Sequence, residues 1–253
     1  HPSGRTIVGG AHDHAVHVWE RRDDRLHARA HVALGHGPIN TIQIRTGHGE
    51  PEAFVGCYSG HVVRVGLDGE VHGALRCHEG AVKSLRLHPN LPLGLSCAAD
   101  GTLNAWNFEG RIRQRYLGHR AIINDLDVEP TAERVASVGR DFALNVFDLD
   151  AGTLLESFDL GRRSLKCVCF FDADTIFIGD YWGQVIRVSL ADREVQRLQV
   201  AGNGLSAIKR AGDRVVTCSY DGGIYALDPA RFEVTQVLRA MQQRLDEPHD
   251  ESL

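Results

Sequence analysis

One pattern of residues recurs six times along the chain. Each copy has an apolar strand, a tight turn that usually ends in Asp, and a further strand in which apolar and polar residues alternate. The turn position is occupied in succession by Asp13, Ser59, Asp100, Asp141, Trp182 and Asp221. These positions are 46, 41, 41, 41 and 39 residues apart. A period of about forty residues with four short strands in each unit is typical of β-propeller blades.

The fourth unit shows the strands most clearly. Strands are expected at 122–128, 134–138, 143–147 and 154–158, separated by turns rich in Gly, Pro and Asp. The third of these strands alternates apolar and polar residues, as a half-buried strand does. No segment between the strands has room for a long helix. The sequence therefore predicts an all-β propeller rather than a sandwich.

The repeated residues resemble those of the WD-repeat family. That family has Gly-His before the first strand of a repeat, then Ser, Asp and Trp at fixed later places. The third and fourth units match best, and the resemblance implies that each contains a buried hydrogen-bonded network. The expected members are His78, Ser96, Asp100 and Trp106 in the third unit, and His119, Ser137 and Asp141 in the fourth. The second and fifth units lack the turn Asp and are expected to rely on apolar packing.

The resemblance covers residues 1–239 and predicts the boundaries of the blades. Blades are expected at 1–34, 35–76, 77–117, 118–160, 161–200 and 201–239, followed by a C-terminal tail, 240–253. The first unit starts at the turn between its first two strands, so its innermost strand has no residues in the chain. We therefore expect the C-terminal part of a longer polypeptide, with upstream residues completing six or seven blades. A bound cleaved fragment or another subunit are alternative sources of that strand.

Composition argues against several classes of partner. The formal net charge is −5 among 253 residues, which gives no sign of a nucleic-acid partner. No apolar run is long enough to cross a membrane. The six cysteines lack the spacing of a zinc site, and we expect buried free thiols in a reducing compartment, the cytoplasm.

Histidine is abundant, and a metal site near the first turn has to be weighed. His12 and His14 flank Asp13, and His17 follows on the next strand. Three ligands in the correct geometry are a demanding requirement, so we expect these side chains to occupy turn and solvent-facing positions without a metal.

The sequence does not show a recognisable set of catalytic residues either. Ser, His and Asp occur together in the best repeats, but the blade networks account for them. The sequence has neither a nucleophile elbow nor a nucleotide-binding loop. We expect no catalytic residue and no cofactor.

The residue before each turn position predicts where partners bind. These residues are His12, Tyr58, Ala99, Arg140, Tyr181 and Tyr220. The resemblance places them on the narrow top face of the propeller, the usual partner surface of the family. Tyr and Arg are over-represented at interaction hot spots. Trp182 adds to the aromatic residues, and Arg120 and Arg163 lie in loops that open onto the same face.

The sequence therefore predicts a non-catalytic scaffold or adaptor that binds proteins, or another domain of its own polypeptide, on the top face. The alternative is a regulatory sensor propeller in a larger signalling or defence protein whose enzymatic domain lies upstream. A third reading, a propeller enzyme with a central metal or cofactor, has the least support in the sequence.

Overall fold

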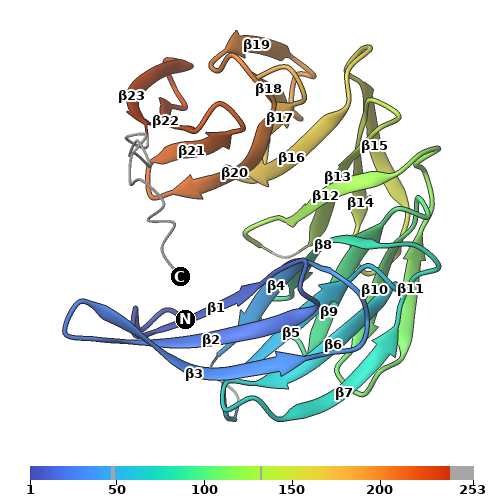
Figure 1. The fold of residues 1–253 in the computed structure, drawn as a ribbon. Helices are drawn as coiled ribbons and strands as arrows, with labels where there is room; N and C mark the ends of the chain where they lie inside the picture. The colour runs from blue at the N-terminus through green and yellow to red at the C-terminus, as the bar shows by residue number, and fades with distance from the viewer. Residues whose placement is uncertain (47–48, 132, 240–253) are drawn as a thin grey trace, which may run out of the picture.

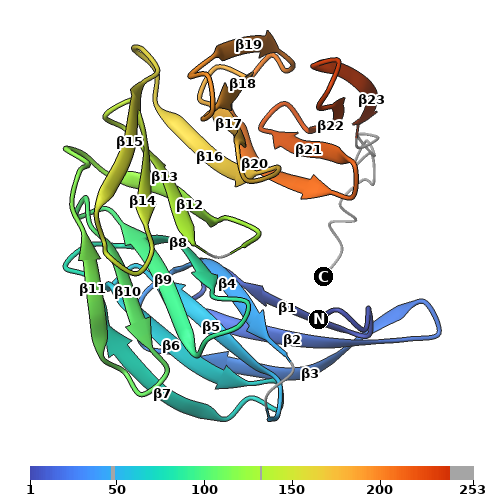
Figure 2. The same cartoon turned by 180° about the vertical axis from the view of Figure 1, so that it is seen from behind.

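The computed structural model of the chain describes residues 1–46, 49–131 and 133–239, which form six antiparallel sheets arranged about an axis (Figures 1 and 2). The first two sheets consist of β1 (Thr6–Gly10), β2 (Ala15–Arg22) and β3 (Arg25–Ala33), and of β4 (Ile39–Arg45), β5 (Glu52–Cys57), β6 (His61–Gly66) and β7 (Val71–Arg76). The third and fourth consist of β8 (Val82–Leu87), β9 (Leu93–Ala98), β10 (Leu103–Asn107) and β11 (Ile112–Tyr116), and of β12 (Ile123–Val128), β13 (Arg134–Gly139), β14 (Ala143–Asp148) and β15 (Leu154–Asp159). The fifth and sixth consist of β16 (Leu165–Phe170), β17 (Thr175–Asp180), β18 (Gln184–Ser189) and β19 (Val195–Gln199), and of β20 (Leu205–Ala211), β21 (Arg214–Ser219), β22 (Gly223–Asp228) and β23 (Glu233–Arg239).

Strands within each sheet follow one another in chain order. The first strands of the four-stranded sheets, β4, β8, β12, β16 and β20, line the axis and pack on one another in succession (Figure 1). The second strands are the most buried, and every residue of β5 is buried. Burial on both faces suits their continuous apolar runs, whereas the half-exposed outer strands alternate. The hydrophobic core is therefore a series of layers between neighbouring sheets.

The prediction of an all-β propeller whose first unit lacks its innermost strand is confirmed. The first sheet has three strands in the order β1-β2-β3, and the other five sheets have four each. The ring is open between the first and last sheets (Figures 1 and 2). The completion of the ring by further residues stays a prediction. The tail expected at 240–253 lies outside the described residues.

Each inner strand contains an irregularity at the same place. The pairing register of the strand shifts by one residue immediately after its first apolar position. The residues left unpaired are Asn40 on β4, Lys83 on β8, Asn124 on β12, Lys166 on β16 and Ser206 on β20. A bulge of this kind turns a side chain away from the ladder direction. Asn40 uses this to donate to the carbonyl of Val82 in the next sheet (2.7 Å).

A buried ion cluster joins the inner strands of the third and fourth sheets. Arg86 Nε on β8 donates to Asp127 Oδ1 on β12 (2.9 Å), and Arg86 Nη2 lies 3.4 Å from Asp125 Oδ1. Burial opposes the charge on Arg86, but the two carboxylates outweigh that effect and raise its pKa. The cluster extends to the fifth sheet, because Asp125 and Asp127 accept the backbone N–H groups of Val168 and Phe170, each at 3.0 Å. One arginine and two carboxylates thus tie three sheets together.

The third sheet contains a chain of buried hydrogen bonds. His78 Nε2 lies 2.8 Å from Ser96 Oγ, and this oxygen accepts a hydrogen bond from Trp106 Nε1 (3.0 Å). On its other side, His78 Nδ1 lies 2.8 Å from Thr102 Oγ1, and this hydroxyl donates to Asp100 Oδ1 (2.8 Å). The Thr102 hydroxyl therefore bridges the His78 ring and the Asp100 carboxylate. The sequence did not predict this role for Thr102.

The fourth sheet has a more direct arrangement. His119 Nδ1 lies 2.9 Å from Asp141 Oδ2, and His119 Nε2 lies 2.8 Å from Ser137 Oγ. Because an ionised carboxylate only accepts hydrogen bonds, Nδ1 carries the proton and Nε2 accepts from the serine. Burial alone would raise the pKa of Asp141, but hydrogen bonds from His119 and from the Arg120 N–H outweigh it and lower the pKa.

We expect Asp141→Ala to lower the free energy of unfolding by about 1–3 kcal/mol, because it leaves the buried His119 N–H without an acceptor. Chemical denaturation of the variant and the wild type measures the difference. Asp150→Ala, which removes an exposed carboxylate from a turn of the same sheet, is the matched control and should change little. Equal stability of the Asp141 variant and the wild type would show that the His119 pair contributes nothing.

The second and fifth sheets contain buried polar groups as well as apolar packing, which corrects the expectation for these units. In the fifth sheet, buried Asp180 accepts the backbone N–H groups of Trp182 (2.8 Å) and Gln184 (2.9 Å). The turn carboxylate has moved two residues upstream rather than disappeared. In the second sheet, buried Glu52 pairs with Arg64 (2.9 Å) and Arg45.

Candidate interaction surface

The turns between the second and third strands meet the loops between sheets at one end of the ring, which we call the top surface. Backbone N–H groups of these loops donate to the turn carboxylates: Glu79 N to Asp100 (2.9 Å), Arg120 N to Asp141 (2.8 Å) and Gly202 N to Asp221 (3.1 Å). Repetition of this contact in three sheets fixes the loops to the turns. The backbone that carries the side chains at these positions is therefore held in place by hydrogen bonds.

Tyr58 is the aromatic residue of the second sheet on this surface. Tyr58 is 40% exposed, and its ring makes an edge contact with the ring of His12 (centroids 5.7 Å apart). Lys83 Nζ, from the bulge of β8, lies 5.4 Å from the centre of the Tyr58 ring. The surface residues of the first three sheets are thus in contact.

Lys166, from the equivalent bulge of β16, has aromatic rings on two sides. Its Nζ lies 5.9 Å from the ring of Tyr181 and 6.0 Å from the ring of Tyr220. Tyr181 makes an edge contact with Trp182 (6.3 Å), and the Arg163 guanidinium lies 5.5 Å from the Trp182 ring. Cations at such distances from aromatic faces are attracted to them.

Positive charge accumulates where these groups approach one another. Burial, and then the charges of Arg140 and Lys166, lower the pKa of Lys83. Within the described ranges, no salt bridge neutralises Lys83, Arg140, Lys166 or Arg163. An anionic group brought to this surface would meet several cations that have no salt-bridge partner among the described residues.

The structure brings residues expected on the top face into two contact groups. His12 contacts Tyr58, and Tyr181, Trp182, Tyr220 and Arg163 gather around Lys166. Arg140 lies near enough to Lys83 to lower its pKa. Arg120 is held at the same end through its backbone N–H on Asp141, and its side chain is exposed.

Lys83 and Lys166 were not identified from the sequence, although they link the aromatic residues. The signal that could have found them is positional. All three lysines of the chain, Lys83, Lys166 and Lys209, lie on inner strands, and two of them fall at the same place in their repeats. An alignment of the units on their first strands places both lysines at the same position, which is that of the bulge.

Comparisons with known proteins agree with this architecture. Residues 69–107 match the family model "WD domain, G-beta repeat". The small ribosomal subunit protein RACK1y of Oryza sativa subsp. japonica is 31% identical over 102 residues, which cover 39% of this chain and 30% of that protein. The cross-pathway control WD-repeat protein 2 of Flammulina velutipes is 31% identical over 88 residues, or 34% of this chain and 28% of that protein. The chain therefore contains a repeat of the WD type and is similar to WD-repeat proteins over part of its length.

Similarity of structure extends further than similarity of sequence. The WD40 β-propeller domain of Doa1 superposes with a TM-score of 0.82 over 94% of this chain and 79% of that chain, at 16% identity. That likeness concerns the fold. The matched segments span less than a third of either curated relative, so the activities of those whole proteins are not transferred to this chain.

The serines and cysteines of the propeller that could act as nucleophiles lie in structural surroundings. The serines beside His78 and His119 belong to the hydrogen bonds within the sheets. The cysteines are free, and all but Cys218 are buried. Burial raises the pKa of Cys57 to about 11 and that of Cys77 to about 12, which disfavours the reactive thiolate.

The histidines near the first turn divide between two environments. His12 turns to Tyr58, whereas His17 approaches Asp13 and is joined by His31, which the sequence analysis did not consider. This second group offers metal-binding atoms and is treated separately below. A search of the described residues finds no helix with the length and hydropathy needed to cross a membrane.

Proposed function

We propose that this WD-repeat propeller is a non-catalytic scaffold or adaptor that binds protein partners across its top surface. The observation that carries the proposal is a pair of groups of exposed aromatic side chains, one around Lys83 and one around Lys166. Neither lysine has a salt-bridge partner among the described residues, and the two are close enough for Lys166 to lower the pKa of Lys83. Such side chains combine apolar area with charge and dominate binding energy at many interfaces. Similarity to WD-repeat proteins supports the same role, since WD40 propellers are generally non-catalytic scaffolds for other proteins.

The chemistry of the surface favours a partner segment that carries acidic or phosphorylated side chains beside apolar ones. Lysine and arginine attract the anions, and the tyrosine and tryptophan rings provide flat apolar contacts. The proposal includes a cytoplasmic location, which the free, buried cysteines favour.

A panel of synthetic peptides of equal length tests the proposal. It contains acidic, phosphorylated, neutral and basic versions of one scaffold, each titrated into the full chain by calorimetry. We expect the acidic or phosphorylated versions to bind and the basic version not to bind. The double variant Arg140→Ala with Tyr181→Ala should weaken the binding at least about tenfold while leaving the circular dichroism spectrum unchanged.

The matched control replaces an arginine and a large apolar residue on the outer strands, Arg113→Ala with Leu155→Ala, both of which are exposed. This variant should bind as tightly as the wild type. Equal affinity of the Arg140/Tyr181 variant and the control would remove the top surface from consideration.

A further inference from the structure

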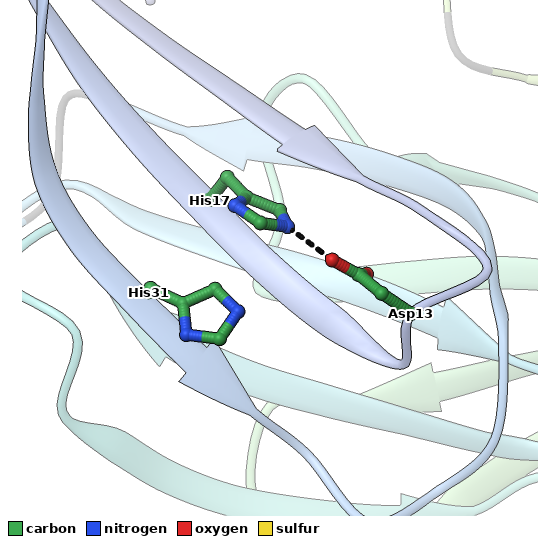
Figure 3. A group of neighbouring side chains, drawn as sticks. All are labelled: Asp13, His17 and His31. Carbon is green, nitrogen blue, oxygen red and sulfur yellow. Dashed lines mark hydrogen bonds and ion pairs between the residues drawn. The ribbon is translucent and has the colours of Figure 1, made fainter. Parts of the chain in front are cut away.

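A group of three potential metal ligands lies on the first sheet (Figure 3). Asp13 belongs to the turn between β1 and β2, His17 to β2 and His31 to β3. One ligand atom from each residue lies within 4.8 Å of the other two. Figure 3 shows the three side chains on the same side of the hairpin, with His17 directed at the carboxylate. The group shares the turn of His12 with the top surface, but its members make none of the top-surface contacts described above.

Strand pairing produces this proximity. His17 and His31 are direct partners in the β2–β3 register, and their ring centroids are 4.7 Å apart. Directly opposed residues in an antiparallel pair bring their side chains together on one face. Because the ladder holds both backbones, the two imidazoles need no rearrangement of the chain to reach a common ion.

Neighbouring groups orient two of the three ligands. The His17 ring stacks on Trp19 with centroids 5.4 Å apart and an angle of 8° between the planes. Asp13 Oδ1 accepts the backbone N–H of Ala15 (3.1 Å), which leaves Oδ2 facing His17 Nε2 at 2.7 Å. Fixed orientation of ligands by a further layer of contacts is a general property of metal sites.

The donor set is not a by-product of the repeat. The residue four after the turn position is His17 in the first sheet, and its counterparts are Asn104, Asn145 and Tyr225. These counterparts pair with Arg115, Ser157 and Val237, respectively. Among these sheets, the first alone places two imidazoles opposite each other beside the turn carboxylate.

We propose that Asp13, His17 and His31 bind a Zn²⁺ ion, with a carboxylate oxygen and one nitrogen from each ring as ligands and a fourth position open to water. Two imidazoles and a carboxylate suit a borderline-soft divalent ion and not Ca²⁺ or Mg²⁺, which take oxygen ligands. Binding replaces the His17–Asp13 hydrogen bond. If His17 coordinates through Nε2, the neutral ring carries its single proton on Nδ1, and a ring protonated on both nitrogens releases the Nε2 proton to water.

Calorimetric titration of the purified, chelator-treated chain with ZnCl₂ tests the site, with CaCl₂ and MgCl₂ as separate arms. We expect one Zn²⁺ per chain and no heat of binding from the other two ions. His31→Ala should weaken Zn²⁺ binding at least about tenfold, since removal of even an outer group costs that much at metal sites. Because His31 is exposed, the variant should fold, and its melting curve checks this.

His27→Ala is the matched control, because His27 is also exposed on β3 and lies outside the group. It should bind Zn²⁺ as the wild type does. Co²⁺ gives a second readout, as a four-coordinate site with nitrogen ligands produces visible absorption that His31→Ala should abolish. The proposal is wrong if Zn²⁺ fails to bind at one ion per chain, or if the His31 and His27 variants bind it equally.

Discussion

Replacing Arg86 by methionine will lower the free energy of unfolding by about 3–5 kcal/mol. The substitution keeps most of the side-chain volume but removes the charge that lies between Asp125 and Asp127. Both carboxylates are mostly buried, with 13% and 19% of their side-chain surface exposed. Loss of the cation leaves two like charges close together and out of water. Urea denaturation followed by circular dichroism measures the effect.

A surface ion pair provides the control for this variant. Arg76 pairs with Glu79, and 59% and 79% of their side-chain surfaces are exposed. Exposed pairs contribute at most about 1 kcal/mol, so Arg76→Met should change the stability far less than Arg86→Met. Adding Asp125→Asn and Asp127→Asn to Arg86→Met should recover part of the loss, because the amide oxygens still accept the N–H groups of Val168 and Phe170. Equal losses in the two single variants would contradict the buried cluster.

The second large effect is expected from Trp106→Ala, which should lower the free energy of unfolding by about 3–5 kcal/mol. Its side chain is 2% exposed, stacks beside Phe54 with centroids 5.6 Å apart, and donates to Ser96. The ring also lies directly on Gly94, where an added Cβ would come within 2.1 Å of it. Truncation therefore opens a cavity between the second and third sheets and leaves polar groups of the network with fewer partners.

Trp182→Ala is the comparison for Trp106→Ala, because the residue type is the same but 59% of Trp182 is exposed. We expect it to change the free energy of unfolding by no more than about 0.5 kcal/mol. Thermal melting of both variants under one set of conditions is sufficient. A Trp106 variant that melts with the wild type would mean that this side chain is not part of the core.

Features repeated within each unit could be predicted from the sequence. The forty-residue period predicted the six sheets, and the order of strands in the first unit predicted that its sheet has three strands. Contacts between units could not be read in the same way. Arg86 meets residues about forty positions further on, and the sequence marks neither partner as special.

Shifts within a unit were missed for a related reason. In the fifth sheet the turn carboxylate comes from Asp180, two residues before Trp182. A repeat pattern that expects the carboxylate at position 182 therefore misses it. Lys83 and Lys166 depend on a bulge, which changes the direction of a side chain without changing the pattern of apolar residues. His31 joins His17 through the pairing of two strands, and its position relative to the turn varies with hairpin length.

The central claim is that partners bind at the top surface, and hydrogen–deuterium exchange tests it most directly. The full chain is compared with and without the tightest-binding peptide of the panel. Slower exchange is predicted in the segments around Tyr58, Arg140, Tyr181 and Tyr220, with no change in the outer strands β7, β11 and β15. Protection limited to the outer strands, with the top-surface segments unchanged, would contradict the account.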